Sequence, residues 1–159
     1  MFTVEAEKFF LQPGFIFASQ EPYLIHTVLG SCVSVCLWDS IQGFGGMNHY
    51  IYGRAKPGQA NGKYGDAAIL HLIRLMRELG SRREDLRAHI IGGAQNPVLN
   101  SRIGEENARV AQEILAAKGI QVVSQDVGGN LGRKVIFNSG TGEVFVYKVQ
   151  QVRESDWYS

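Results

Sequence analysis

The sequence predicts a single-domain α/β (α+β) protein, built as a layered sandwich of mixed β-sheet with two main flanking helices. Three observations support this class. Apolar residues make up 45% of the 159 residues, which is enough for one sizeable core. Segments rich in β-branched and aromatic residues stand toward both ends of the chain. Between them lie two segments with the apolar spacing of amphipathic helices.

The first part of the chain is expected to form strands. Residues 3–11, 23–29 and 32–39 have the β-branched and aromatic content of short strands, and the last of them alternates with a period of two. Residues 45–53 are predicted to be the antiparallel partner of residues 32–39, because a short glycine-containing loop joins the two segments.

Two helices are expected in the middle of the chain. Residues 63–80 place apolar side chains at three- and four-residue steps and end in a glycine, which commonly stops a helix. Residues 101–119 are acidic near their start and close with Lys118 and Gly119, the order of charges that a helix dipole favours. The segment between the helices, residues 86–94, is predicted to be a strand that ends in paired glycines.

The chain is expected to close with strands. Residues 120–129 are predicted to form one strand, and residues 133–149 a hairpin around the turn at 139–142. No internal repeat, low-complexity tract or proline-rich linker divides the sequence. We therefore expect residues 1–159 to be one domain.

Composition argues against several classes of function. Sixteen basic and fifteen acidic residues leave a formal charge of +1, so nucleic acid and acidic membranes are not expected partners. Apolar runs are far shorter than the roughly 20 residues of a membrane span, so membrane insertion is not expected. The N-terminus lacks the basic-then-apolar order of a signal peptide, which favours a cytoplasmic location. Residues 128–134, GGNLGRK, lack phosphate-loop spacing, so nucleotide binding is not expected.

The two cysteines, Cys32 and Cys36, need separate interpretations. A disulfide between them is not expected, because four residues of strand span about 13 Å and a bridge needs Cα atoms within about 7 Å. Zinc is not expected either, since no second Cys/His pair stands at finger spacing. Cys36 lies inside the alternating run and is predicted to pack in the core.

Cys32 differs because it follows Gly30 and Ser31 where a strand begins. A glycine there lets the backbone approach a ligand and can leave amide N–H groups facing a developing oxyanion. The pattern supports a nucleophile and a core thiol about equally. A nucleophilic thiol needs a base, and both His49 on the partner strand and His26 on the entering strand fit. Spacing favours His49 only modestly.

Six stretches of the sequence follow one another in an order that is typical of one protein family. They are LGSCVSVCLWD, GGMNHYIYG, KYGDAAILHLIRLM, IGGAQ, IGEENARV and DVGGNLGRKVIFNSGTGEVFVYKV, between residues 22 and 149. The ordered set resembles the chemoreceptor glutamine deamidase family, CheD. The tail, residues 150–159, lies outside this resemblance. The resemblance implies a layered sandwich similar to that of cytotoxic necrotizing factor-type deamidases.

The resemblance also implies a set of site residues. The Gly-Ser-Cys match implies that Cys32 is the nucleophile, and the match to GGMNH implies that His49 is the general base. The third member of the family's site is a threonine on the strand that enters the turn, and Thr27 is its candidate here. A plain strand-forming role is the alternative for Thr27. Gly30 and Ser31 are expected to support an oxyanion through the backbone. No cofactor and no metal is implied.

The implied function is hydrolytic deamidation of glutamine side chains to glutamate on methyl-accepting chemotaxis receptors, through a thioester on the cysteine. This is the reaction of a protein-glutamine glutaminase, and it regulates chemotaxis adaptation. The receptor cytoplasmic domain is the implied protein substrate, and the CheC phosphatase is a second implied partner. The alternative is a non-catalytic module that docks receptors or CheC. A transglutaminase-like or peptidase-like enzyme would use the same dyad on another acceptor.

Overall fold

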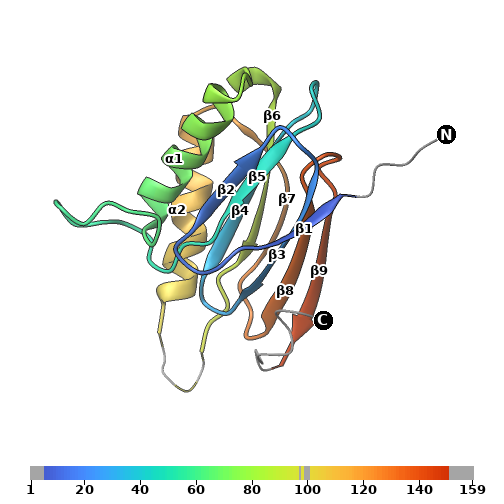
Figure 1. The fold of residues 1–159 in the computed structure, drawn as a ribbon. Helices are drawn as coiled ribbons and strands as arrows, with labels where there is room; N and C mark the ends of the chain where they lie inside the picture. Colours follow the sequence, from blue (N-terminus) through green and yellow to red (C-terminus); the bar gives the residue numbers. More distant parts are fainter. Residues whose placement is uncertain (1–5, 97, 99–100, 151–159) are drawn as a thin grey trace.

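The protein is built in three layers. The computed structural model describes residues 6–96, 98 and 101–150. Helices α1 (Gly65–Glu78) and α2 (Ile103–Ala117) pack beside each other on one face of a five-stranded sheet (Figure 1). A four-stranded sheet covers the other face of that sheet. The predicted α+β layered sandwich with two flanking helices is therefore confirmed.

Both sheets contain parallel and antiparallel pairs. In order across the five-stranded sheet, the strands are β2 (Ile16–Ser19), β5 (Gly45–Asn48), β4 (Val33–Asp39), β6 (Leu86–Gly92) and β7 (Gln121–Val127). Those of the four-stranded sheet are β1 (Glu7–Phe10), β3 (Tyr23–Leu29), β8 (Gly132–Asn138) and β9 (Val144–Val149). The pairs β6–β7 and β1–β3 are parallel, and the other pairs are antiparallel. A single 3-10 turn, η1 (Arg83–Asp85), leads into β6.

Strand β2 is the one strand of the described residues that the sequence pattern does not predict. It is four residues long, all half-buried, and shows no alternation between apolar and polar side chains. Its pairing with β5 depends on a close approach of the two backbones, since a Cβ at Gly46 would collide with the carbonyl oxygen of Phe17. The strand forms because the glycines of β5 let its backbone come close enough to pair. The residues of β2 themselves carry no sign of that pairing.

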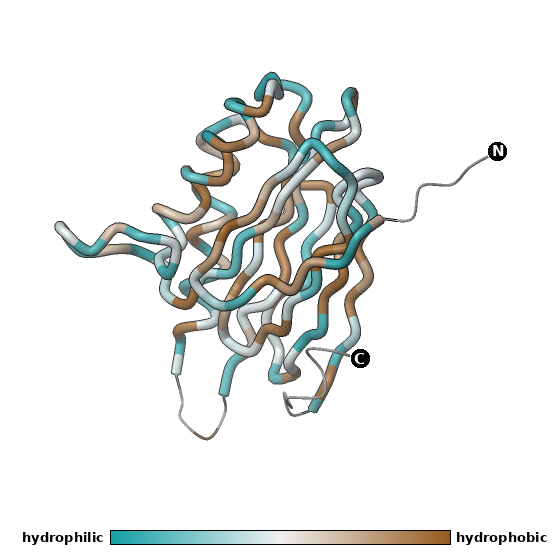
Figure 2. Tube along the Cα trace, viewed as in Figure 1, coloured by the Kyte–Doolittle hydropathy of each residue, from teal (hydrophilic) through white to brown (hydrophobic). Residues whose placement is uncertain are grey.

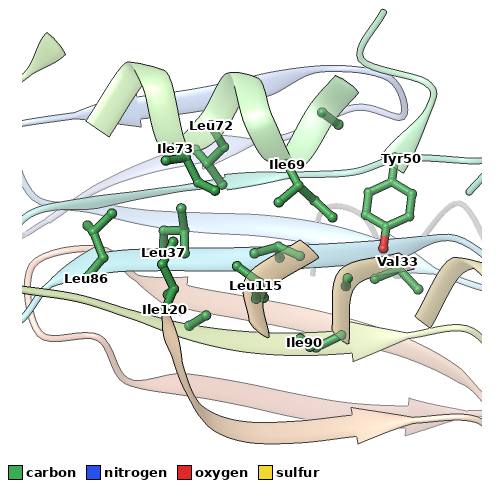
Figure 3. Packing of buried hydrophobic residues seen from close by; sticks show 14 of the residues in the cluster. Val33, Leu37, Tyr50, Ile69, Leu72, Ile73, Leu86, Ile90, Leu115 and Ile120 are labelled. Carbon is green, nitrogen blue, oxygen red and sulfur yellow. The ribbon is translucent and has the colours of Figure 1, made fainter. Parts of the chain in front are cut away.

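The larger core lies between the helices and the five-stranded sheet (Figure 3). Ile69 and Leu72 of α1 meet Val33 and Leu37 of β4, and all four side chains are fully buried. Burying one aliphatic side chain of this size stabilises the fold by about 1.5–3 kcal/mol. The three- and four-residue spacing that predicts α1 is the spacing of the side chains that face this core.

A second core fills the space between the two sheets. It contains Ile25 and Leu29 of β3, Cys36 of β4 and Met47 of β5. Cys36 is fully buried, with its Sγ 3.4 Å from Met47 Sδ, so the prediction that it packs in the core is confirmed. Strand β4 is thus buried on both faces. Hydrophobic stretches run along the strands of both sheets, and most connecting loops are hydrophilic (Figure 2).

Within the described ranges, none of the helices combines the length and the apolar character that crossing a membrane requires.

Candidate active site

Cys32 lies where the chain passes from one sheet to the other. Strand β3 of the four-stranded sheet ends at Leu29, and β4 of the five-stranded sheet begins at Val33. Residues 30–32, the Gly-Ser-Cys turn, make this crossing. The Cys32 side chain is half-buried and packs against the core between the sheets. Both cysteines are free thiols, as expected from their spacing.

The loop at residues 92–94 holds the Gly-Ser-Cys turn through two backbone hydrogen bonds. The backbone N–H of Gly93 donates to the carbonyl oxygen of Cys32 at 2.9 Å, and that of Ala94 donates to the carbonyl oxygen of Gly30 at 3.0 Å. Gly92 has a φ of +116°, and a Cβ there would collide with the Cys32 carbonyl oxygen. The paired glycines of the IGGAQ stretch therefore allow a backbone approach that a larger residue would block.

Helix α2 supports both parts of the site. Gly104, in its first turn, packs so closely on the loop at residues 92–94 that a Cβ would meet the carbonyl oxygens of that loop. One turn later, Asn107 is fully buried. Its Nδ2 donates to the carbonyl oxygen of Ser31 at 2.9 Å and to that of Ile51 at 2.8 Å.

His49 follows directly on β5, and its position relative to Cys32 is set by the β4–β5 register. Val33 and Tyr50 exchange both backbone hydrogen bonds, which places Ser34 opposite His49. Cys32 and His49 are thus diagonal neighbours on the face that looks into the space between the sheets. In antiparallel pairs such neighbours have Cα atoms about 7–8 Å apart, within reach of long side chains.

Thr27 reaches His49 from the other sheet. Its Oγ1 lies 2.7 Å from His49 Nδ1, and the same hydroxyl donates to the carbonyl oxygen of Leu11 at 2.9 Å. A hydroxyl has one hydrogen, so the bond to His49 requires Nδ1–H as the donor. This tautomer places the basic lone pair on Nε2. Thr27 therefore makes a specific contact that a plain strand-forming residue would not make.

Burial sets the charge states of the two candidate groups, Cys32 and His49. His49 is 1% exposed, and desolvation lowers its pKa to about 4. Burial also raises the pKa of the Cys32 thiol, and the hydrogen bond from its own backbone N–H opposes this only in part. At neutral pH the resting pair is therefore a neutral thiol and a neutral imidazole. Chemistry at this pair requires proton transfer from sulfur to Nε2 as the sulfur attacks.

The other buried histidines lie elsewhere in the fold. His26 follows the alternation of β3 to the side opposite Thr27, where its ring packs 5.0 Å from the ring of Phe10. His89 donates from Nε2 to the carbonyl oxygen of Gly142 and stacks on Trp38, with ring centroids 4.4 Å apart. Of the two bases that spacing leaves open, His49 is the one that faces the same inter-sheet space as Cys32.

A pocket opens beside the Gly-Ser-Cys turn. Its volume is about 480 Å³, and Gly30, Ser31 and the N-terminal residues of α2 form part of its wall. Besides Ala94 and Gly132, the rest of the lining is neutral and polar: Gln95, Asn96, Ser101, Asn130 and Gln150. The backbone N–H groups of Ser31 and Cys32 donate to no other residue among those described. The pocket is large enough for a glutamine side chain and the backbone that carries it.

Sequence reasoning does not single out Asn107. The signal was available, because Asn107 stands in the buried stripe of α2 together with Gly104, Ala108 and Ala111. A polar residue at an apolar position of a helix has to bond something inside the protein. What it bonds depends on segments far away in the sequence.

In the described part of the chain, no cluster of three or more His, Cys, Asp or Glu side chains is arranged to hold a metal ion.

Comparisons with known proteins agree on one family. Residues 52–148 match the family model described as CheD chemotactic sensory transduction. The chain is 39% identical over 153 residues to a probable chemoreceptor glutamine deamidase CheD of Sulfurimonas denitrificans, covering 93% of this chain and 98% of that protein. Proteins of the same description are 42% identical over 148 residues in Trichlorobacter lovleyi (91% and 92% covered) and 37% over 172 residues in Thiobacillus denitrificans (99% and 84% covered).

The match to the family model begins after His49, so it includes neither Cys32 nor His49. The alignments to the relatives each cover more than nine-tenths of the chain and therefore span Thr27, Cys32 and His49.

Proposed function

The chain belongs to the CheD family, and we propose that it hydrolyses glutamine side chains of chemotaxis receptors to glutamate. One observation carries the proposal for this chain. The 2.7 Å contact between Thr27 Oγ1 and His49 Nδ1 leaves the basic nitrogen of His49 on the side of the ring away from Thr27. His49 and Cys32 share the inter-sheet face, so that nitrogen is the candidate base for the thiol.

In the first half of the reaction, the Cys32 sulfur attacks the carboxamide carbon of the substrate while its proton moves to His49 Nε2. The carbonyl becomes a tetrahedral oxyanion. His49 then returns the proton to the amide nitrogen, the carbon–nitrogen bond breaks, and ammonia leaves. A histidine with a pKa of about 4 is a strong acid once protonated, which favours this proton return to a poor leaving group.

In the second half, His49 removes a proton from water as the water oxygen attacks the thioester carbon. The carbon–sulfur bond breaks, the sulfur regains its proton, and the product is a glutamate side chain. No other co-reactant is needed.

The oxyanion needs donors, and the Gly-Ser-Cys turn supplies candidates. The N–H groups of Ser31 and Cys32 bond no other described residue, and Ser31 lines the pocket. Loss of one such donor costs about 3 kcal/mol of transition-state stabilisation in enzymes of this chemistry. The carbonyl groups on either side of these N–H groups are held by Gly93 and Ala94, so the donors are fixed before substrate arrives.

The consequence for the receptor is electrostatic. Each turnover replaces a neutral amide by a carboxylate, which a methyltransferase can then esterify, and this would adjust signalling during chemotaxis adaptation. A receptor's cytoplasmic domain as substrate requires an enzyme in the cytoplasm. CheC, the second partner that the family resemblance implies, stays a prediction: it would compete with the receptor for the face that bears Cys32.

The experiment is incubation with a receptor cytoplasmic fragment, followed by mass measurement of its glutamine-containing peptides. We expect the mass change of amide to acid at specific glutamines, and no change with Cys32→Ala. Binding of the fragment without any mass change would instead support the non-catalytic docking module. Cys36→Ala is the matched control, because Cys36 is buried away from the pocket.

A further inference from the structure

We infer that Asn107 is a positioning residue that holds the Gly-Ser-Cys turn and the strand of the general base at a fixed separation. The inference rests on the proposed function of Cys32 and His49, and it assigns to Asn107 a part in catalysis that needs no contact with the substrate.

The two hydrogen bonds of Asn107 reach the two segments that carry the reactive pair. Its Nδ2 donates one hydrogen to the carbonyl oxygen of Ser31, which precedes Cys32. The other goes to the carbonyl oxygen of Ile51, which lies two residues after His49. A single nitrogen atom thus bridges two segments from different parts of the chain.

This bridge stands where the β4–β5 ladder ends. Val33 and Tyr50 form the last backbone pair of the ladder. Beyond it, the N–H of Tyr52, which the next hydrogen-bonded pair of the ladder would use, donates to the carbonyl oxygen of Lys63 instead. The Asn107 side chain links the two segments just beyond this last pair. The strands can separate there, as an open site requires, and still be tied to each other.

Contacts of helix α2 with the core and with the loop at residues 92–94 fix the position of Asn107. The backbone oxygen of Asn107 accepts the hydroxyl of Tyr50 at 2.5 Å, and the Tyr50 ring is fully buried in the larger core (Figure 3). Gly104, one turn earlier, packs on the loop that holds the carbonyl groups of Gly30 and Cys32. The first two turns of α2 therefore contact both segments of the site.

Stability alone does not explain an asparagine here. The Oδ1 atom of Asn107 is buried and accepts no hydrogen bond from any described residue. An unsatisfied buried acceptor is unfavourable, so the side chain costs the fold something on that side. What it contributes is two donors on one neutral atom, aimed at two carbonyl groups. Aspartate has the same shape without the donors.

The test is Asn107→Asp, made in the full chain and assayed on the receptor fragment. The variant places a carboxylate against two carbonyl oxygens, so the turn and the strand should separate. We expect kcat to fall roughly 10- to 100-fold, because small displacements of reacting groups have effects of this size. KM should change by less than about twofold, since the residue does not touch substrate.

The pH profile separates positioning from simple destabilisation. A buried carboxyl has a raised pKa, and once protonated it regains one donor. The ratio of variant to wild-type kcat should therefore rise as the pH is lowered from about 8 to about 5.5. Destabilisation alone gives a ratio that does not improve toward acid. Such a ratio, or a wild-type kcat in the folded variant, would overturn the inference.

Ser81→Ala is the matched control for lost stability. Ser81 is buried, and its hydroxyl donates to Asp39 Oδ2 at 2.7 Å at the far end of β4. That end is roughly 23 Å of strand away from Cys32. We expect this variant to lose stability and keep kcat, with both proteins assayed well below their unfolding temperatures. If Asn107→Asp does not fold, Asn107→Ser, which keeps a single short donor, replaces it.

Alkylation of Cys32 by iodoacetamide gives a readout that does not depend on the receptor. Asn107→Asp should slow it at neutral pH, because His49 would no longer lie in position to take the proton. If the wild-type chain deamidates nothing, the proposed function fails, and the alkylation rates still decide whether Asn107 sets the Cys32–His49 geometry. If the wild type is active and both rates are unchanged in the folded variant, only the role of Asn107 fails.

Discussion

The hydroxyl of Thr27 lies 2.7 Å from Nδ1 of His49, and this hydrogen bond joins the two sheets at the site. The hydroxyl also donates to the carbonyl oxygen of Leu11, so a backbone group of a third segment determines which nitrogen of His49 carries hydrogen. A carboxylate in this place would also stabilise the protonated imidazole by charge. A neutral hydroxyl orients the ring and leaves its pKa low, at about 4 in this buried position.

Thr27→Val removes the hydroxyl and keeps the shape of the side chain. We expect kcat to fall roughly 10- to 100-fold, about 1.4–2.7 kcal/mol, because His49 then samples the wrong tautomer and orientation. The buried Nδ1–H and the Leu11 carbonyl lose their partner, which should lower the free energy of unfolding by about 1–3 kcal/mol. Thr27→Ser keeps the hydroxyl and is the control. Receptor deamidation and urea unfolding measure the two effects, and full activity of Thr27→Val would show that the contact is dispensable.

Acid should destabilise the protein through His49. Its pKa is about 4 in the folded state and about 6.5 in the unfolded state, so the unfolded state binds the extra proton between these values. The contribution is therefore fully present above pH 6.5 and is lost as the pH falls toward 4, by up to about 3 kcal/mol. His26 and His89, whose pKa values burial also lowers, act in the same direction.

The measurement is urea unfolding from about pH 7.5 to about pH 4.5 for the wild type and His49→Gln. The difference between the two curves isolates His49, because His26 and His89 are common to both proteins. Parallel curves would contradict the low pKa of His49.

The two thiols should differ in reactivity. Cys36 is fully buried with a strongly raised pKa, so iodoacetamide should reach it only after unfolding. Cys32 is half-buried and should react in the folded protein. Because burial raises its pKa as well, its rate should increase about tenfold per pH unit from neutrality upward. Peptide mass mapping after timed alkylation separates the sites. A fast rate that persists below pH 6 would instead indicate a preformed thiolate–imidazolium pair.

Gly92→Ala tests the close approach that holds the Gly-Ser-Cys turn. The new Cβ would collide with the carbonyl oxygen of Cys32 at a φ of +116°. Gly80→Ala is a matched control, since Gly80 has a φ of +111° with open space around its Cβ position. Backbone strain of about 1 kcal/mol or more is common to both variants, so the difference between them isolates the collision.

We expect Gly92→Ala to lose about 2 kcal/mol more stability than Gly80→Ala and to reduce receptor deamidation, which Gly80→Ala leaves intact. Chemical denaturation and the deamidation assay give the two results. Equal losses in the two variants would mean that the loop yields and that the turn does not depend on Gly92.

Most elements of the fold could be predicted because their signals are local. The helical spacing over Gly65 to Glu78 arises because one face of the helix is buried, which places an apolar residue at every third or fourth position. The period of two over Val33 to Asp39 arises because the two faces of the strand pack in different cores, one under the helices and one between the sheets. Strand β2 shows no such periodic spacing of apolar residues. Its existence depends on Gly46 of β5, which accepts its backbone at close range.

The sequence by itself determined the family, through the order of its motifs, and it reduced the candidates for a thiol and its base to Cys32 with His49 or His26. Only the tertiary structure decided the hydrogen-bond partner of each side chain. Thr27 meets His49, and Asn107 meets Ser31 and Ile51, across segments that no local pattern connects. Periodicity reports which face of an element is buried, whereas a hydrogen bond depends on the distance and direction between two atoms, which the packing of whole layers sets.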